Sequence, residues 1–382
     1  MELTYLDNNA TTRPAPQVVE AMTRVNTTAW GNPSSTHRFG QLARREIDDA
    51  RSAVAKLVGC GDSELLFTAG GTEASNTGIR SLLASRSPRR KVVTSTVEHS
   101  ATRQTLQALA HDGTAEVVEI PVDTLGRLDV QRAIDSIDDS VALVTLIWAN
   151  NETGVVWDLG PIIEACKRHR VPIHVDATQA VGKIPVDPKS LGADCATIAG
   201  HKFHGPKGVG ALFVRKGLRL RPLIIGGPQE RERRGGTENV AGIAGMGVAA
   251  TLALDALPQM SRVAMLRDRL EKSILSGISQ TRVNGDVSSR LPNTTNIGFQ
   301  RLEAEPILLL LSEKGVCASA GAACSSGSLE PSHVLRAMGI DETFAHGSIR
   351  FSLSRETTDA EVDRCLSVLP EVIERLRRVL PV

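Results

Sequence analysis

The chain has 382 residues, which is too long for one ordinary hydrophobic core, so we expect two domains. Its 44 basic residues nearly balance its 43 acidic residues, and a net charge of +1 excludes the basic surface that DNA binding requires. The longest apolar runs, such as residues 307–311, are too short to span a membrane, and residues 1–7 lack the pattern of a signal peptide. We therefore expect a cytoplasmic protein with neither DNA nor a membrane as partner.

Strand and helix patterns alternate from residue 64 to residue 214. The predicted strands are residues 64–68, 91–94, 115–120, 141–148, 173–176, 195–198 and 209–214. The predicted helices between them are residues 72–83, 101–111, 129–137 and 159–169. This rhythm predicts a mainly parallel seven-stranded sheet with helices on both faces. Ligands of such sheets bind beyond the carboxyl ends of the strands, so polar groups that follow the strands are expected to converge.

The pattern changes near residue 239. Long helices are predicted at residues 240–256 and 261–276, followed by short strands at 281–283 and 296–299, helices at 307–314 and 358–379, and a strand at 348–352. This mixture is typical of an α+β unit. We expect a large α/β domain of residues 15–240 and a smaller α+β domain made of residues 1–14 and 241–382.

One lysine lies in an unusual setting. Lys202 belongs to a cluster of glycine, histidine and proline at residues 199–208, and Asp176 ends an apolar strand upstream. Pyridoxal phosphate needs a lysine amine for its Schiff base and a carboxylate against its pyridine nitrogen. A solvated surface lysine is the ordinary alternative, but such a lysine usually lies on a charged helix face. The cluster around Lys202 therefore favours a pyridoxal phosphate site.

Three further strand ends carry candidate groups. Gly71 and Thr72 precede a predicted helix and would bind a phosphate at its N-terminus, although a glycine turn with a threonine cap explains them equally well. His99 could lie against the cofactor ring as an acid or base, or could simply cap a helix at the surface. Asn151 follows the most apolar strand and is either a ligand of the cofactor's phenolic oxygen or part of a turn.

Two residues near the C-terminus suggest a nucleophile and a substrate clamp. Cys324 lies in a run of small residues at 316–328, which predicts a mobile loop that carries a thiol, although an incidental thiol is the alternative. The six scattered cysteines show no CxxC pair, which argues against a metal site and for reduced thiols. Arg350, on an alternating strand, could hold a carboxylate through two hydrogen bonds or could be an edge-strand surface charge.

Taken together, these motifs resemble the NifS/IscS-type cysteine desulfurases, within the class V aminotransferases of pyridoxal phosphate fold type I. The resemblance covers nearly the whole chain. It rests on ordered matches at residues 5–12, 31–35, 71–73, 97–99, 150–154, 176, 202, 234–239, 324–333 and 349–352.

The resemblance implies roles for the cofactor site. Lys202 would hold pyridoxal phosphate as a Schiff base and later move protons at the substrate Cα atom, while Asp176 would pair with the pyridine nitrogen. His99 would stack on the ring and serve in proton transfer. The remaining cofactor contacts would be Gln179 and Asn151 at the phenolic oxygen, Gly71, Thr72 and His201 at the phosphate, and Thr237 from the neighbouring subunit of a homodimer.

The same resemblance implies the reaction. Arg350, with Asn151, would bind the carboxylate of the substrate L-cysteine, and Cys324 would take the sulfur as a persulfide and release L-alanine. The persulfide would pass to an acceptor protein such as an iron–sulfur scaffold. Similar proteins often have serine where this chain has Ala199, so phosphate binding must rely more on the other donors. The long Cys324 loop argues against the SufS-type branch, and the short tail before Val382 favours the NifS-like branch.

Several alternatives remain open at this point. The chain could be a selenocysteine lyase or another class V pyridoxal phosphate transferase, such as an aminotransferase that has no need of Cys324. A hydrolase of another class could pair Cys324 with His333 or His346 and would need no cofactor. A sulfur carrier without catalytic activity is the third alternative, but a carrier has no use for a Schiff-base lysine.

Overall fold

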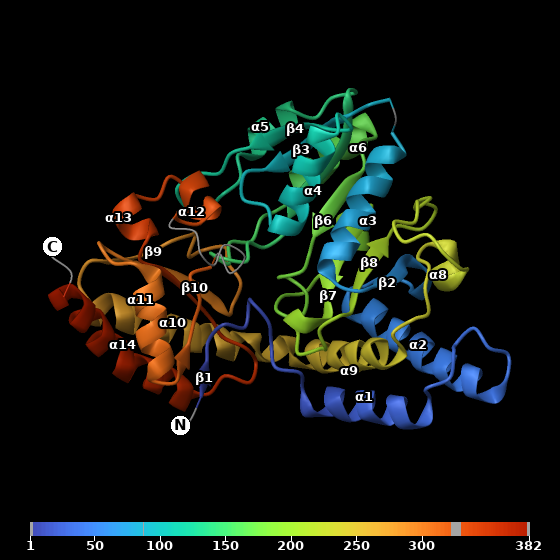
Figure 1. Cartoon of the computed structure of the whole chain (residues 1–382). Helices are drawn as coiled ribbons and strands as arrows, with labels where there is room; N and C mark the ends of the chain where they lie inside the picture. The colour runs from blue at the N-terminus through green and yellow to red at the C-terminus, as the bar shows by residue number, and fades with distance from the viewer. Residues whose placement is uncertain (1–2, 87, 322–329, 380–382) are drawn as a thin grey trace.

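The computed structural model describes residues 3–86, 88–321 and 330–379. Figure 1 shows a large unit built around a twisted sheet and a smaller unit beside it, with helix α9 (Val240–Ala256) running along the base of the large unit. Each unit has its own cluster of buried apolar side chains, one around the sheet and one between the helices and strands of the smaller unit. Both clusters are mainly aliphatic, as a chain with 3% aromatic residues requires.

The large sheet has seven strands in the order β2-β8-β7-β6-β5-β3-β4, which confirms the mainly parallel sheet predicted from the sequence. The five strands from β7 to β4 in that order pair in parallel, whereas β8 pairs antiparallel with both β7 and β2. The strands are β2 (Leu65–Thr68), β3 (Lys91–Ser95), β4 (Glu116–Ile120), β5 (Val141–Ile147), β6 (Ile173–Asp176), β7 (Cys195–Ala199) and β8 (Gly210–Val214).

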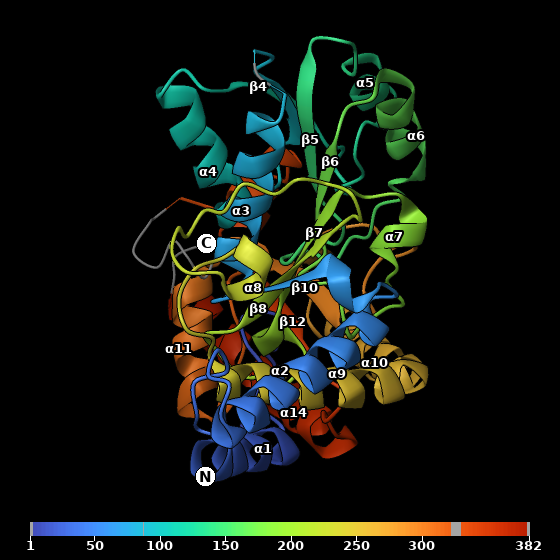
Figure 2. The ribbon, with the colours of Figure 1, turned by 90° about the vertical axis from the view of Figure 1, so that its right-hand side faces the viewer.

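Helices cover both faces of this sheet. In Figure 2, α3 (Gly71–Ala84) and α4 (Ser100–His111) lie on one side, and α5 (Val130–Asp135) and α6 (Gly160–His169) lie on the other. The sequence predicted these four helices, but it predicted none before residue 64, where α1 (Pro16–Thr28) and α2 (Arg38–Leu57) form. Both helices are largely polar and bury one apolar face each at helical spacing, so the sequence does carry a helical pattern here that the prediction did not use. The short helices are α7 (Pro188–Leu191) and α8 (Gln229–Glu232).

The smaller unit is an antiparallel sheet backed by helices. Its central strand β10 (Thr294–Phe299) pairs with β9 (Thr281–Val283) and β12 (Ser348–Ser352). The N-terminal strand β1 (Thr4–Tyr5) joins this unit by pairing in parallel with β11 (Val316–Cys317). Its helices are α10 (Met260–Gly277), α11 (Ala304–Glu313), α12 (His333–Ala337), α13 (Glu342–Ala345) and α14 (Asp359–Val379).

The stretch from Val240 to Gly277 contains the most apolar helix of the described chain. It is long and apolar enough to cross a membrane by length and composition alone, and 61% of its most apolar window is buried inside the protein. The apolar runs considered in the sequence analysis did not include α9, because this helix is made largely of the small residues alanine and glycine. Their burial against α1 and α2 explains the composition without a membrane, since a core helix is apolar all round.

Close packing of α9 on α2 depends on Gly247. A Cβ atom at this position would lie 2.6 Å from the Ala50 Cα atom, so the two backbones would have to separate. We predict that Gly247→Ala lowers the stability of the holoenzyme by about 1–3 kcal/mol, the usual cost of overpacking a core. Thermal unfolding measures the effect. Gly277→Ala is the matched control, because nothing lies within 4 Å of its added methyl group. Equal melting temperatures for the two variants would contradict this packing argument.

Candidate active site

A cavity of about 540 Å³ opens beyond the carboxyl ends of the parallel strands, between the large and the smaller unit. All the site residues predicted from the sequence line it, except Thr237 and Cys324. Thr237 lies exposed in the loop before α9, and Cys324 lies outside the described residues. The lining predicted residues are Gly71, Thr72, His99, Asn151, Asp176, Gln179, His201, Lys202 and Arg350.

The Lys202 amine is held by the N-terminal segment. The lysine ends a short 3₁₀ turn (Gly200–Lys202) that follows β7 directly. Its Nζ atom donates hydrogen bonds to the carbonyl oxygens of Asn9 at 2.6 Å and Ala10 at 2.8 Å. The sequence separation of 193 residues between Asn9 and Lys202 hid this contact from sequence reasoning. The alternative of a solvated surface lysine is therefore wrong.

Asp176 and Gln179 form the wall next to Lys202. Asp176 is the last residue of β6 and is 3% exposed, and its Oδ1 atom accepts a hydrogen bond from the Thr178 amide at 3.0 Å. Gln179 donates from Nε2 to the Asn9 carbonyl oxygen at 2.9 Å. The cavity therefore brings a buried carboxylate, a side-chain amide and a lysine amine together, which is the set of groups that pyridoxal phosphate requires.

The N-terminus of α3 forms the opposite end of the cavity. Gly71 is the first residue of α3, and a Cβ atom there would lie 3.3 Å from the Ala199 methyl group, so only a glycine leaves this end of the cavity open. The free amides of the first helical turn favour an anion, and Ala199 adds no donor. The His201 ring bonds the Thr11 hydroxyl at 3.1 Å, and burial together with Lys202 lowers its pKa to about 4.

His99 caps a helix and lines the cavity at the same time. Its Nδ1 atom accepts a hydrogen bond from the Ala101 amide at 3.1 Å, as the N-cap of α4. The neutral ring must therefore carry its proton on Nε2. Burial lowers the pKa of His99, and the nearby Lys202 lowers it further, although Asp176 acts in the opposite direction. The ring thus enters the cavity wall as a neutral hydrogen-bond donor.

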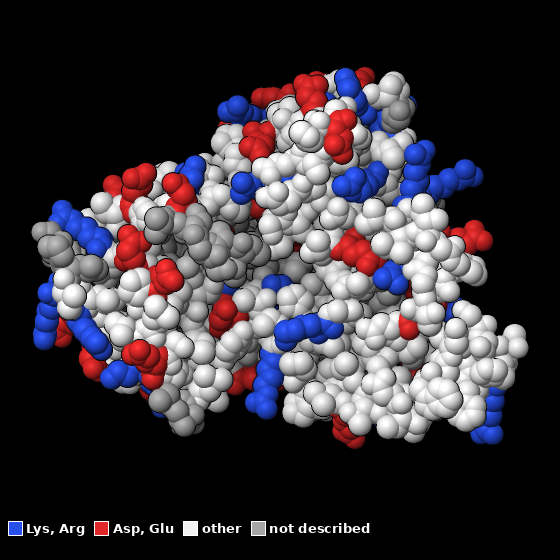
Figure 3. All heavy atoms as spheres, viewed as in Figure 1, with Lys and Arg blue, Asp and Glu red and all other residues white. Residues whose placement is uncertain are grey.

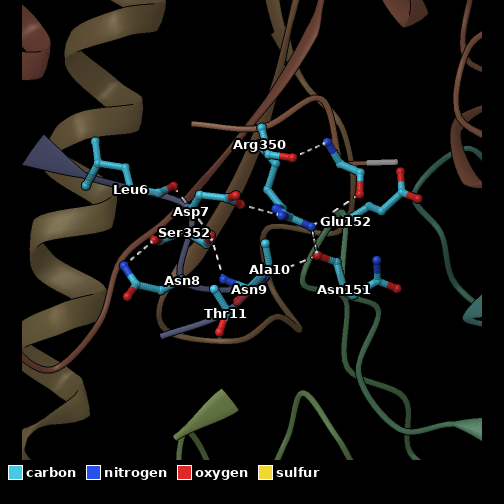
Figure 4. A network of polar contacts seen from close by, with 12 residues as sticks. Leu6, Asp7, Asn8, Asn9, Ala10, Thr11, Asn151, Glu152, Arg350 and Ser352 are labelled. Atoms are coloured by element: carbon cyan, nitrogen blue, oxygen red, sulfur yellow. Dashed lines mark hydrogen bonds and ion pairs between the residues drawn. The ribbon is translucent and has the colours of Figure 1, made fainter. Parts of the chain in front are cut away.

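Arg350 is buried in β12 and is 1% exposed, so the alternative of a surface charge is wrong. Figure 4 shows its contacts: Nη2 donates to the Asp7 carboxylate at 2.6 Å, and Nη1 donates to the carbonyl oxygens of Asn151 at 3.0 Å and Gly321 at 3.3 Å. A guanidinium has five N–H groups. The Nε–H group and one N–H of Nη2 thus have no partner among the described residues, and the Arg350 side chain lines the cavity.

Two buried glutamates lie at the cavity, Glu152 in its lining and Glu98 outside the lining, and the sequence assigned neither of them a role. Glu98 accepts at Oε1 from the Ser95 hydroxyl at 2.6 Å and the Ile147 amide at 3.0 Å, while its Oε2 atom has no partner in the described part of the chain. Burial raises the pKa of Glu98 to about 8. Glu152 accepts from the Ser332 hydroxyl, and burial raises its pKa to about 7.

Of the two histidines considered as hydrolase partners, one lies at the site. His333 lines the cavity and its Nε2 atom lies 3.0 Å from the Glu98 carbonyl oxygen. His346 is not among the lining residues and faces Glu303 at 3.5 Å. Sequence reasoning missed Asp7, Asn9 and Lys183, which hold the cavity residues in place. The only available signal was the polar Asp7-Asn8-Asn9 run directly after a short N-terminal strand.

Comparison with known proteins places the chain in one family. Residues 4–365 match the family described as Aminotransferase class-V. A cysteine desulfurase of a Nostoc species is 50% identical over 382 residues, which cover 100% of this chain and 95% of that protein. A solved NifS-like protein superposes with a TM-score of 0.92 at 34% identity, covering 98% of this chain and 100% of the other. The structure of SspA in complex with cysteine superposes with a TM-score of 0.81 at 31% identity. The match covers 93% of this chain and 100% of the other.

The buried Glu98 predicts a specific pH dependence of stability. Its pKa is 4.5 in the unfolded chain and about 8 in the folded one, so the folded state holds the proton more tightly. Glu98 therefore reduces the free energy of unfolding as pH rises from 4.5 to 8, by at most about 1.4 kcal/mol per pH unit. We predict that Glu98→Gln flattens this decline in denaturant titrations across that window. Glu303→Gln, at an exposed position, is the control, and a Glu98→Gln slope equal to the control's would refute the assignment.

Proposed function

The chain belongs to the class-V aminotransferase family and, within it, to the NifS-type cysteine desulfurases, and on this premise we propose that its cavity removes the sulfur atom from L-cysteine. The observation that carries the proposal is the meeting of Lys202, Asp176 and Arg350 in one cavity. A lysine and a carboxylate suit the cofactor, and a buried arginine suits the carboxylate of an amino acid. The likeness to a protein solved in complex with cysteine supports the same substrate.

The residues present fit pyridoxal phosphate. Lys202 would hold its aldehyde carbon, Asp176 would face its ring nitrogen, and the N-terminus of α3 with His201 would receive its phosphate. When bound, the cofactor supplies an electron-withdrawing ring that stabilises the negative charge left when a bond at the substrate Cα atom breaks. The buried Asp176 favours this function, because a carboxylate keeps the ring nitrogen protonated.

Lys202 and His99 would have different roles near the substrate Cα atom. Lys202 would be the base that takes the Cα proton, because its amine lies in the cavity next to the proposed cofactor position. The Nδ1 atom of His99 accepts from the Ala101 amide, so its Nε2–H group would donate a hydrogen bond in the cavity that His99 lines. In this neutral form His99 accepts no proton at Nε2.

Arg350 orients the substrate through its two remaining N–H groups. Its contact with Asp7 and with two carbonyl oxygens fixes the guanidinium plane before the substrate arrives. A preformed clamp of this kind loses little freedom on binding, so the carboxylate is held in one direction and the side chain of cysteine in another. The Asn151 carbonyl oxygen helps to hold the clamp.

Cys324 is the sulfur acceptor in this proposal. Its thiolate attacks the substrate sulfur, so that a sulfur–sulfur bond forms as the substrate Cβ–sulfur bond breaks. The electron pair stays on the substrate carbon, which takes up a proton and leaves as L-alanine. The enzyme retains the sulfur as a persulfide on Cys324. An acceptor protein then receives the sulfur, and an iron–sulfur scaffold is the acceptor that the resemblance to NifS favours.

We also propose that the chain works as a homodimer in which Thr237 reaches the partner's phosphate site. The α3 N-terminus borders a second hollow of about 510 Å³ that shares Gly71, Thr72 and His201, so this end of the site is open. The large unit also exposes large apolar side chains. They include the stacked rings of Trp30 and Phe39, 67% and 50% exposed, and Ile225, 86% exposed.

The surface over α1 and α2 carries few charged side chains at the lower right of Figure 3. Low charge around exposed aromatic and aliphatic side chains is typical of a surface that another protein covers. We predict that Ile225→Asp weakens dimerisation by at least about tenfold, because the aspartate would be desolvated at the contact. Sedimentation equilibrium measures the effect, and Leu309→Asp, on the exposed face of α11, is the control. A monomeric wild-type protein would contradict the homodimer.

If Cys324 accepts the sulfur, the variants Cys324→Ala and Cys317→Ala should differ in the rate of alanine formation. Incubation of the holoenzyme with L-cysteine should yield L-alanine and a protein persulfide in equal amounts at the first turnover. Cys324→Ala should lose at least about 100-fold in alanine formation, since no other thiol takes the sulfur. Cys317→Ala is the control and should keep wild-type rates, because burial and Asp7 raise the pKa of Cys317 and leave it largely protonated. A Cys324→Ala variant that still releases alanine would exclude this function for Cys324.

A further inference from the structure

A second lysine, Lys183, is buried beside the cavity and has no task in the reaction proposed above. It lies in the turn after β6 and is 6% exposed. Its Nζ atom donates hydrogen bonds to the Oδ1 atom of Asn9 at 2.8 Å and to the Oε1 atom of Gln179. Both acceptors are neutral amides. Burial, with Lys202 and Arg350 nearby, holds the pKa of Lys183 well below its usual range.

The contact with Lys183 helps to fix the orientation of the Gln179 side-chain amide. The oxygen and nitrogen ends of an amide have nearly the same shape, so hydrogen-bond partners decide its orientation. Lys183 donates to Oε1, and the Asn9 carbonyl oxygen accepts from Nε2 at 2.9 Å. The amide nitrogen carries two hydrogens. One is used by Asn9, and the other remains available to a group bound in the cavity, which Gln179 lines.

Lys183 also fixes Asn9, which in turn holds Lys202. The Oδ1 atom of Asn9 accepts from Lys183 and from Asn293 at 3.1 Å, and its Nδ2 atom donates to the Thr294 hydroxyl at 2.9 Å. Figure 4 shows Asn9, which belongs to the N-terminal segment, close to Asn151. The carbonyl oxygen of the same residue accepts from the Lys202 amine. Lys183 therefore contacts Gln179 directly and is linked to Lys202 through Asn9.

We propose that Lys183 is a positioning residue, whose amine holds Gln179 with its NH₂ group toward the cofactor. The proposal rests on the proposed function, because the acceptor of the free Gln179 hydrogen is the phenolic oxygen of pyridoxal phosphate. A donor on that oxygen stabilises its negative charge and weakens its hold on the proton of the linkage nitrogen. Without Lys183 only the Asn9 carbonyl oxygen opposes a turn of the Gln179 amide, and a turned amide would place its oxygen toward the anionic oxygen.

The test is a pH titration of the visible absorbance of holoenzyme with Lys202-bound cofactor. Lys183→Met keeps the length of the side chain and removes its donors. We expect the midpoint of the absorbance transition to rise by about one pH unit, and the dissociation constant for pyridoxal phosphate to rise about tenfold. Lys189→Met is the control, because Lys189 is exposed and pairs with Glu64 away from the cavity. It should titrate as the wild type does.

A double variant separates positioning from a general structural role. If Lys183 acts through Gln179, the midpoint of Lys183→Met/Gln179→Leu equals that of Gln179→Leu alone, whereas independent effects would add. Added shifts, or a Lys183→Met midpoint equal to wild type, would overturn the proposal. Should Lys183→Met give no folded holoenzyme, Lys183→Leu removes the same donors from a smaller side chain and is read in the same way. A wild-type protein that binds no cofactor and forms no alanine would instead overturn the proposed function.

Discussion

One short N-terminal segment holds the two cations on which the proposed site depends. The carbonyl oxygens of Asn9 and Ala10 bind the Lys202 amine, and the Asp7 carboxylate binds Arg350 (Figure 4). The segment is itself fixed, because β1 pairs with β11 and the Asn9 amide donates to the Ser352 hydroxyl at 2.9 Å. The lysine belongs to the large unit and the arginine to the smaller one. The spacing between cofactor lysine and substrate clamp is thus set by a segment that contacts both.

The same cavity has a charge balance that suits anionic ligands. Burial raises the pKa values of Glu98 and Glu152 to about 8 and about 7, so near neutral pH Glu98 is mostly protonated and Glu152 is only partly ionised. Asp7 pairs with the Arg350 guanidinium, and Asp176 is the side chain that we propose for the ring nitrogen. In the proposed site, a phosphate at one end would meet helix amides and a substrate carboxylate at the other would meet Arg350.

The sequence was most informative where local pattern and topology agree. Parallel strands must end at one edge of the sheet, so Asp176, Asn151 and Lys202 could be brought together before any coordinates were known. Arg350 followed from its strand pattern and its family resemblance. Asn9, Asp7 and Lys183 could not be found in this way, because their partners lie far along the chain and amides carry no local signature. The helices α1 and α2 were missed although their apolar residues recur at helical spacing, because the prediction began at residue 64. The roles of Thr237 and Cys324 stay predictions.

Mapping the cofactor attachment point tests the central claim most directly. The holoenzyme is reduced with borohydride, which makes the lysine linkage permanent, and the digested protein is analysed by mass spectrometry. The account predicts one modified peptide, with the phosphopyridoxyl group on the side chain of Lys202. Attachment at Lys183 or at any other lysine, or no attachment after incubation with pyridoxal phosphate, would contradict it.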